Sequence, residues 1–140
     1  MNLTIDSSVF ISSLLETDAL HKDSRKFFTL LTSQSVTIVE PVTVLFEVAN
    51  ILTKAGKKDG SPLLDSFSRF HILSLDDSIT KEMVFVFSKV RLTTADAIIV
   101  WSTYVSESTL VTWDRVLLRE AQKLVPALTP REYLKKLHTL

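Results

Sequence analysis

Short runs rich in β-branched and other apolar residues alternate in this chain with longer segments whose apolar residues recur at helical spacing. The predicted strands are 3–5, 36–39, 71–75 and 109–112, with a weaker fifth at 125–128. The predicted helices are 8–16, 20–33, 42–56, 62–70, 78–90, 94–106 and 115–124, with a final turn near 130–138. This alternation favours an α/β fold in which helices cover both faces of a mostly parallel sheet.

Length and composition favour one compact domain over residues 1–140. A hydrophobic content of 46% and a mean hydropathy of +0.23 argue against disorder. No apolar run approaches the roughly 20 residues of a membrane-spanning helix. The start Met-Asn-Leu-Thr-Ile-Asp lacks the basic and apolar regions of a signal peptide. We therefore expect a soluble, cytoplasmic protein.

Several classes of catalytic site are excluded by the residues that the chain lacks. Without cysteine there is no disulfide, thiolate metal site or cysteine nucleophile. Its two glycines, Gly56 and Gly60, form no dinucleotide-binding loop, phosphate-binding loop or Gly-x-Ser-x-Gly turn. The three histidines have no metal-ligand spacing. Any catalysis would therefore depend on oxygen ligands.

Net charge gives no general attraction for nucleic acid, because 16 basic and 16 acidic side chains cancel. Binding of RNA or DNA would require a local basic cluster. The candidates are Lys54 with Lys57 and Lys58, Arg115 with Arg119, and Arg131 with Lys135 and Lys136. Each cluster is also consistent with an ordinary solvated helix face.

Four carboxylates, Asp6, Glu47, Asp96 and Asp114, occur in otherwise apolar surroundings. Asp6 and Asp114 each follow a predicted strand, where an N-cap would explain either one alone. Parallel α/β sheets bind ligands at the carboxyl ends of their strands, so the two together favour a site. Acids taken out of water without a partner cost free energy, and a shared divalent cation would compensate them.

Asp96 and Glu47 occur on predicted helices. Asp96 is in the first turn of a helix that is apolar nearly all round, although the helix dipole also favours an acid there. Glu47 belongs to a polar stripe with Asn50 and Lys54, which either faces solvent or directs Glu47 and Asn50 into a site.

Strand-end position alone does not select these acids. Glu40 ends the second predicted strand and Asp76 and Asp77 end the third. Pro41 after Glu40, and the Asp-Asp-Ser helix start, indicate turn and capping roles. We place these three acids outside the site.

Four motifs in order resemble the PIN domain family, and most of all its small VapC-like toxins of toxin–antitoxin pairs. The motifs are Ile-Asp6-Ser-Ser-Val-Phe-Ile, Phe-Glu47-Val-Ala-Asn-Ile-Leu, Thr-Thr-Ala-Asp96-Ala-Ile-Ile-Val and Leu-Val-Thr-Trp-Asp114. The terminal Leu128-Thr-Pro-Arg-Glu-Tyr-Leu is similar to the last strand and helix of the family. The resemblance implies a three-layer α/β/α fold with a five-stranded sheet in the order 3-2-1-4-5.

The resemblance also implies a metal-dependent endoribonuclease in which all four acids are catalytic. We expect Asp6 and Asp96 to bind Mg²⁺ or Mn²⁺ directly, and Asp114 and Glu47 to bind through water or a second ion. Metal-activated water would then cleave RNA to a 5′-phosphate and a 3′-hydroxyl. Supporting roles are assigned to Ser7, Asn50 and Thr112, and substrate phosphate contacts to Arg115 and Arg119.

Two other functions remain open at this point. One is a non-catalytic PIN-like module that binds RNA or protein. The other, a phosphotransfer enzyme with an aspartate nucleophile, is disfavoured because Ser8 stands where a second aspartate is expected. The resemblance further implies a homodimer and a small antitoxin partner. Phe85, Phe87 and Val90 are either core residues or part of such a contact.

Overall fold

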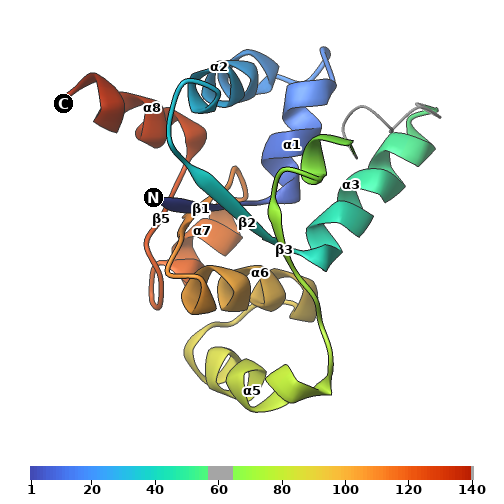
Figure 1. Ribbon diagram of the computed structural model, residues 1–140, viewed down its shortest axis with the longest axis vertical. Coiled ribbons are helices and arrows are strands. Elements are labelled where there is room, and N and C mark those ends of the chain that lie inside the picture. The colour runs from blue at the N-terminus through green and yellow to red at the C-terminus, as the bar shows by residue number, and fades with distance from the viewer. Residues whose placement is uncertain (57–64, 140) are drawn as a thin grey trace.

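The computed structural model, shown in Figure 1, describes residues 1–56 and 65–139. These residues contain one five-stranded sheet in the order β3-β2-β1-β4-β5, with every neighbouring pair parallel. The strands are β1 (Asn2–Ile5), β2 (Thr37–Pro41), β3 (His71–Leu73), β4 (Thr109–Val111) and β5 (Ala127–Leu128). The predicted strand order is confirmed, and the carboxyl ends of all the strands meet at one edge of the sheet.

The centre of the sheet is its most buried part. In β1, which pairs with β2 on one side and β4 on the other, Leu3, Thr4 and Ile5 are all 0% exposed. Leu110 and Val111 of β4 are equally buried. Helices cover both faces of a parallel sheet, so its central strands read as continuous apolar runs and do not alternate with polar residues.

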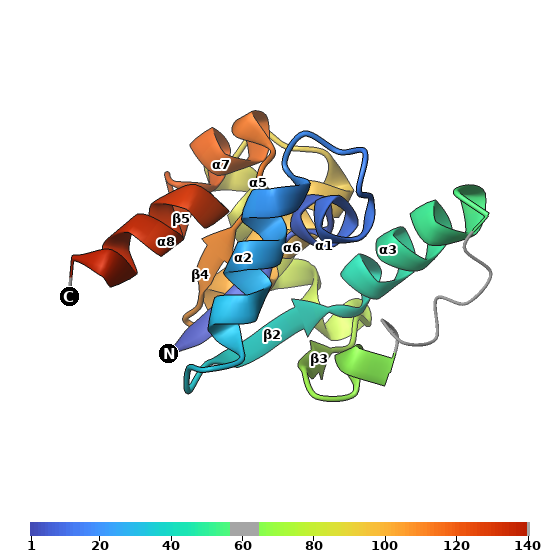
Figure 2. The ribbon, with the colours of Figure 1, turned by 90° about the horizontal axis from the view of Figure 1, so that it is seen from above.

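Helices form the two outer layers. They are α1 (Ser7–Leu14), α2 (His21–Leu31), α3 (Val42–Lys54), α5 (Thr80–Lys89), α6 (Thr94–Val105), α7 (Arg115–Ala121) and α8 (Pro130–His138), with a 3₁₀ turn η1 (Asp77–Ile79). Figure 1 shows α1 and α2 on one side of the sheet and α6 on the other, with α5 outside α6. Figure 2 shows α3 extending away from the sheet. Within the described ranges, no helix is long and apolar enough to cross a membrane.

Aromatic packing fixes α1, the helix that starts directly after Asp6. Phe10 is 2% exposed. Its ring centroid lies 5.1 Å from the ring of Phe28 on α2 and 5.1 Å from that of Phe67. Burial of each such ring contributes about 2–3 kcal/mol. The first turn of α1 therefore has a well-supported position.

Some predicted details need correction. The helix expected at 78–90 is divided into η1 and α5, and Asp76 accepts a bond from the Ser78 N–H, which confirms its capping role. The turn role expected for Glu40 is wrong, because this residue is fully buried within β2. Residues 65–67 of the helix predicted at 62–70 are helical. Lys57, Lys58, Gly60 and the start of that predicted helix lie outside the described residues.

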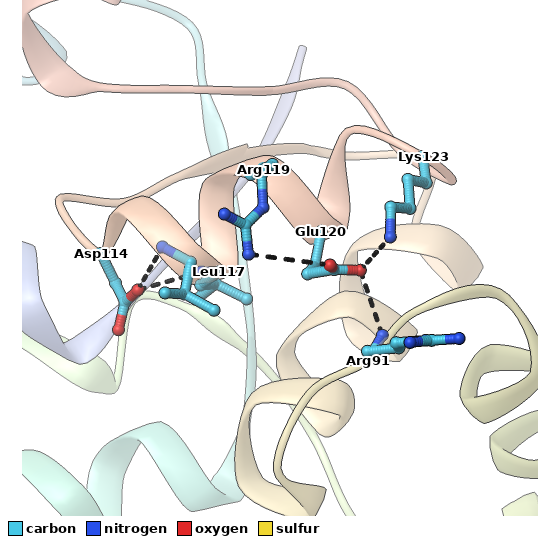
Figure 3. A network of polar contacts seen from close by, with 7 residues as sticks. Arg91, Asp114, Leu117, Arg119, Glu120 and Lys123 are labelled. Carbon is cyan, nitrogen blue, oxygen red and sulfur yellow. Dashed lines mark hydrogen bonds and ion pairs between the residues drawn. The ribbon is translucent and has the colours of Figure 1, made fainter.

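Glu120 connects α7 to the segment that leads into α6, as Figure 3 shows. Its side chain is 8% exposed. The Oε2 atom accepts bonds from the Arg91 backbone N–H at 3.1 Å and the Lys123 Nζ at 2.5 Å, and the Arg119 Nη2 lies 3.9 Å from Oε1. The bonds from Lys123 and Arg91 hold the pKa of Glu120 below its usual value. This carboxylate fixes the approach to α6, the helix of Asp96.

The Glu120→Gln substitution should destabilise the protein at neutral pH by removing this charge. Because the folded-state pKa is lowered, the charge stabilises the fold above the ordinary pKa of 4.5 and loses that effect as pH falls through the lower folded-state value. Urea unfolding should therefore show a difference between wild type and variant that shrinks below about pH 4.5.

The matched control for this test is Glu16→Gln, at an exposed position, which should leave stability unchanged at every pH. If the loss of stability in Glu120→Gln stays constant down to pH 3, the charge of Glu120 does not stabilise the segment that leads into α6.

Candidate functional site

Pairing of β1 with β4 places two of the candidate acids at one sheet edge. Ile5 is in register with Val111, and the Asp6 N–H donates to the Val111 carbonyl at 2.9 Å. Asp6 therefore lies beside Thr112, and Asp114 follows two residues later. This is the edge at which parallel α/β sheets bind ligands.

Asp6 occupies the N-cap position of α1 but does not cap it. Its side chain is only 4% exposed and makes no N-cap hydrogen bond, although the nearby Ser8 backbone N–H helps to lower its pKa. Instead, the Ser8 and Thr112 hydroxyls donate to its Oδ2 atom at 2.5 Å and 2.9 Å. Capping alone therefore does not account for this buried carboxylate, which hydroxyls from both neighbouring segments hold at the strand edge.

Asp114, by contrast, is an N-cap. Its Oδ1 atom accepts from the backbone N–H groups of Val116 and Leu117, both at 2.9 Å (Figure 3). Both bonds use Oδ1, so capping does not engage Oδ2. The Thr112 hydroxyl oxygen accepts from the Asp114 N–H at 3.0 Å while its proton is donated to Asp6. Thr112 thus connects the two acids.

Glu47 is joined to the same edge from α3. The Ser7 hydroxyl, at the start of α1, donates to its Oε2 atom at 2.7 Å. Glu47 is half-buried, so its part of the predicted polar stripe is only partly exposed to solvent. Asn50 and Lys54, further along the same stripe, are exposed. The structure therefore brings Glu47 and Ser7 together and leaves Asn50 in solvent.

Asp96 lies in the first turn of α6 and is half-buried. Its backbone N–H donates to the Thr93 hydroxyl at 3.3 Å, so Thr93 is the N-cap and the carboxylate of Asp96 is not needed for that role. The side chain lies close enough to Asp6, Glu47 and Asp114 for their negative charges to interact.

Burial and mutual repulsion raise the pKa of three of these acids. Burial is the largest cause for Asp6, Glu47 and Asp96. The charge of Asp6 also raises the pKa of Glu47 and of Asp96, and the charge of Asp114 raises that of Asp6. Hydrogen bonds from hydroxyls oppose the rise at each position. Asp6 is therefore the common member of an acidic cluster whose four carboxylates come from four segments.

A donor set of carboxylate oxygens, with raised pKa values, suits Mg²⁺ or Mn²⁺, because a divalent cation relieves the repulsion. Within residues 1–56 and 65–139, however, no three histidine or acidic side chains are close enough to hold a metal ion between them. Hydroxyl and amide groups occupy several of the carboxylate oxygens. The residues fit such an ion chemically, but they form an electrostatic cluster and not a completed coordination shell.

The two candidate phosphate-binding residues differ in their surroundings. Arg115 is exposed in the first turn of α7, directly after Asp114. Arg119 lies one turn later, and Figure 3 shows its guanidinium directed toward Glu120. The position of Arg115 is thus the more open of the two to a substrate phosphate.

Two residues near the acids were not identified from the sequence. Ser8 donates to Asp6 and accepts from the Trp113 N–H at 3.2 Å, which joins α1 to the end of β4. Glu40 contacts the backbone next to Asp6, since the Ile5 N–H donates to its Oε1 atom at 2.6 Å. A hydroxyl two residues after Asp6 was a usable signal for Ser8. Glu40 was missed because Pro41, the next residue, indicated a turn.

Comparison with known proteins identifies the fold. Residues 3–124 match the model of the PIN domain family, whereas no curated protein matches the sequence. The structure is similar to VapBC2 from Rickettsia felis, solved with a DNA fragment from its promoter (TM-score 0.70, 18% identity, covering 92% of this chain and 98% of that one). It is also similar to a toxin–antitoxin complex from Klebsiella pneumoniae (TM-score 0.69, 16% identity, 91% and 97%) and to FitAcB from Neisseria gonorrhoeae (TM-score 0.64, 15% identity, 92% and 98%).

The family match spans the segments that carry all four acids, from Asp6 to Asp114, and the solved structures have a similar fold. The chain belongs to the PIN domain family.

Proposed function

We propose that this protein is a divalent-metal-dependent endoribonuclease, built as one PIN domain over residues 1–140, and that it is the toxin of a VapBC-type toxin–antitoxin pair in the cytoplasm. The observation that carries the proposal is Asp6, a buried carboxylate that does not cap its helix and that interacts electrostatically with three other acids. Membership of a family whose members are generally nucleases supports hydrolysis of a phosphodiester. The identity of the ion, Mg²⁺ or Mn²⁺, and of the RNA is part of the proposal.

Each acid has a defined role in this scheme. Asp6 and Asp96 would hold the ion directly, and Glu47 and Asp114 would hold it through water or hold a second ion. When bound, the divalent ion lowers the pKa of water and stabilises negative charge on the phosphate and the leaving oxygen. Glu47 or Asp114 orients the attacking water by accepting its hydrogen bond. Water adds to phosphorus and the P–O3′ bond breaks, which leaves a 5′-phosphate and a 3′-hydroxyl.

The neighbouring polar residues hold these acids in place. Ser8 and Thr112 fix one oxygen of Asp6, and Ser7 fixes one oxygen of Glu47. Because Asn50 is exposed, we assign it to contact with a bound substrate and not to support of Asp6. We assign Arg115 to a substrate phosphate, with Arg119 as a weaker second contact because Glu120 lies beside it.

Replacing Asp6 by asparagine should lower Mn²⁺-dependent cleavage of total RNA by more than about 100-fold, because a ligand charge is lost. The matched control is Asp77→Asn, at an exposed position on η1, which should cleave RNA like wild type. Products should be mapped for their 5′-phosphate and 3′-hydroxyl ends.

Full activity of the Asp6→Asn variant, or of wild type in excess EDTA, would contradict this mechanism. Tight Mn²⁺ or RNA binding without any cleavage would instead favour the alternative, a non-catalytic PIN-like binding module.

The same substitution should stabilise the metal-free protein. Because the folded-state pKa of Asp6 is raised above its usual 3.8, ionisation of Asp6 costs stability as pH rises from 3.8 through the folded-state value. Asparagine has no such charge. In urea unfolding with EDTA, the free energy of unfolding of Asp6→Asn should therefore exceed that of wild type by an amount that grows as pH rises. At pH 3 the difference should be small.

Added Mn²⁺ should reverse this order by raising the melting temperature of wild type more than that of the variant. An Asp6→Asn variant that is equally destabilised at every pH would argue that no repulsive acidic cluster exists.

An apolar surface on α5 and α6 supports the proposal of a homodimer. Its members are Val84, Phe85, Phe87, Tyr104 and Val105, each at least 39% exposed, whereas Val90 is a core residue. The rings of Phe85 and Tyr104 are 5.5 Å apart and join the two helices. Several large exposed apolar side chains on two adjacent helices are typical of an interface. We assign it to a second copy of the chain, and a small antitoxin as the further partner is supported by the toxin–antitoxin complexes among the similar structures.

Light scattering should therefore report a dimer for wild type and a monomer for Phe87→Glu, because a charge buried in the interface is costly. Val116→Glu, at another exposed apolar position, should remain dimeric. Wild-type protein that is monomeric at micromolar concentration would contradict this assignment.

A further inference from the structure

Glu40 is a fully buried acid that the proposed chemistry does not use. It lies in β2 and is 0% exposed. Its Oε1 atom accepts from the Ile5 N–H at 2.6 Å, and its Oε2 atom has no hydrogen-bond partner among the described residues. A buried carboxyl with one unpaired oxygen is costly, and such a group calls for an explanation.

The position of Glu40 coincides with a change in how β1 and β2 are joined. Their register pairs are Asn2 with Thr37 and Leu3 with Ile38. Beyond these pairs, two side chains bridge the strands: the Thr4 hydroxyl donates to the Val39 carbonyl at 2.9 Å, and the Ile5 N–H donates to Glu40. On its other side, β1 pairs with β4 through the backbone up to Asp6. Side-chain hydrogen bonds thus join the end of β1 to β2, whereas backbone hydrogen bonds join it to β4.

Glu40 also stands at the base of the helix that carries Glu47. Pro41 ends β2 and α3 begins at Val42, so Glu40 is two residues from the start of that helix. Its bond to Ile5 therefore joins the residue before Asp6 to the segment that places Glu47. The Ser7–Glu47 bond is the second link between these segments, on the other side of Asp6 in sequence.

The bond from Ile5 requires only an acceptor at Oε1, and an uncharged carboxyl supplies one. Burial raises the pKa of Glu40 well above its usual 4.5, and the negative charge of Asp6 raises it further. Glutamine offers a carbonyl oxygen in the same place, whereas leucine fills similar volume without an acceptor. These two residues separate the hydrogen bond from simple filling of the space.

We propose that Glu40 is a positioning residue of the acidic site, which acts through the Ile5 amide to fix Asp6 relative to Glu47. This inference rests on the proposed function, since the expected effect of removing Glu40 is weaker metal binding at the acidic site. It assigns to Glu40 no contact with metal or RNA.

The test measures three properties in wild type, Glu40→Gln and Glu40→Leu: Mn²⁺ affinity by calorimetry, the kcat and KM of RNA cleavage, and hydrogen exchange of the Ile5 amide. In Glu40→Leu we expect faster Ile5 exchange, Mn²⁺ affinity and kcat lower by about 10–100-fold, and an unchanged KM for RNA. Glu40→Gln should restore all three values to within about threefold of wild type.

Thr4→Val is the matched control, because it removes the other bridge between the same strands without affecting the Ile5 amide. It should lower the melting temperature as Glu40→Leu does, yet keep wild-type Mn²⁺ affinity. If Thr4→Val weakens Mn²⁺ binding as much as Glu40→Leu, general strand stability explains the effect and the positioning role is overturned.

Wild-type Mn²⁺ affinity in Glu40→Leu, or a Glu40→Gln variant as impaired as Glu40→Leu, would also overturn the role of Glu40 while the proposed function stands. Wild-type protein that neither binds Mn²⁺ nor cleaves RNA would overturn the proposed function, and the role of Glu40 with it.

Discussion

The hydrogen bonds that hold Asp6 in place are the interaction on which the rest of the site depends. A carboxylate at 4% exposure loses most of its hydration, and two hydroxyls replace only part of it. The remaining cost appears as a raised pKa, to which neighbouring acids add. A buried carboxylate at the end of the central strand therefore lowers the stability of the fold. Functional sites commonly show this exchange of stability for chemistry.

Short side-chain bonds, more than backbone, connect the acids to one another. Thr112 donates to Asp6 and accepts from Asp114, while Ser7 joins the start of α1 to Glu47. A hydroxyl can donate and accept at once, as Thr112 does here, so it links neighbouring groups without adding charge. Glu120 provides a separate support from outside the cluster by fixing the approach to α6. Among the residues that the structure describes, no basic side chain forms an ion pair with any of these four acids, so uncharged hydroxyl and backbone groups hold them at one edge.

The sequence predicted the fold because the fold depends on patterns that repeat over many residues. Strand order came from the family resemblance, and strand positions from runs such as Leu3 to Ile5. The expectation for Glu40 failed because a proline is equally compatible with a turn and with the last residue of a strand, and Pro41 is the last residue of β2. Burial of Glu40 is decided by β1, which is distant in sequence, and no local pattern reports it. The bond of Ser8 to the Trp113 N–H likewise depends on a contact between distant segments, whereas the motifs of the sequence were enough to select the four acids and Thr112 as candidates.

The placement of β1 between β2 and β4 has a consequence for biosynthesis. Asp6 is made among the first residues, but its bond to Thr112 spans 106 positions of the chain. Long-range contacts of this kind form late in folding, after the intervening loop has closed. A ribosome must therefore release nearly the whole sheet before the Asp6 edge is complete. The acidic edge that we propose as the nuclease site would therefore be incomplete while the chain is only partly synthesised.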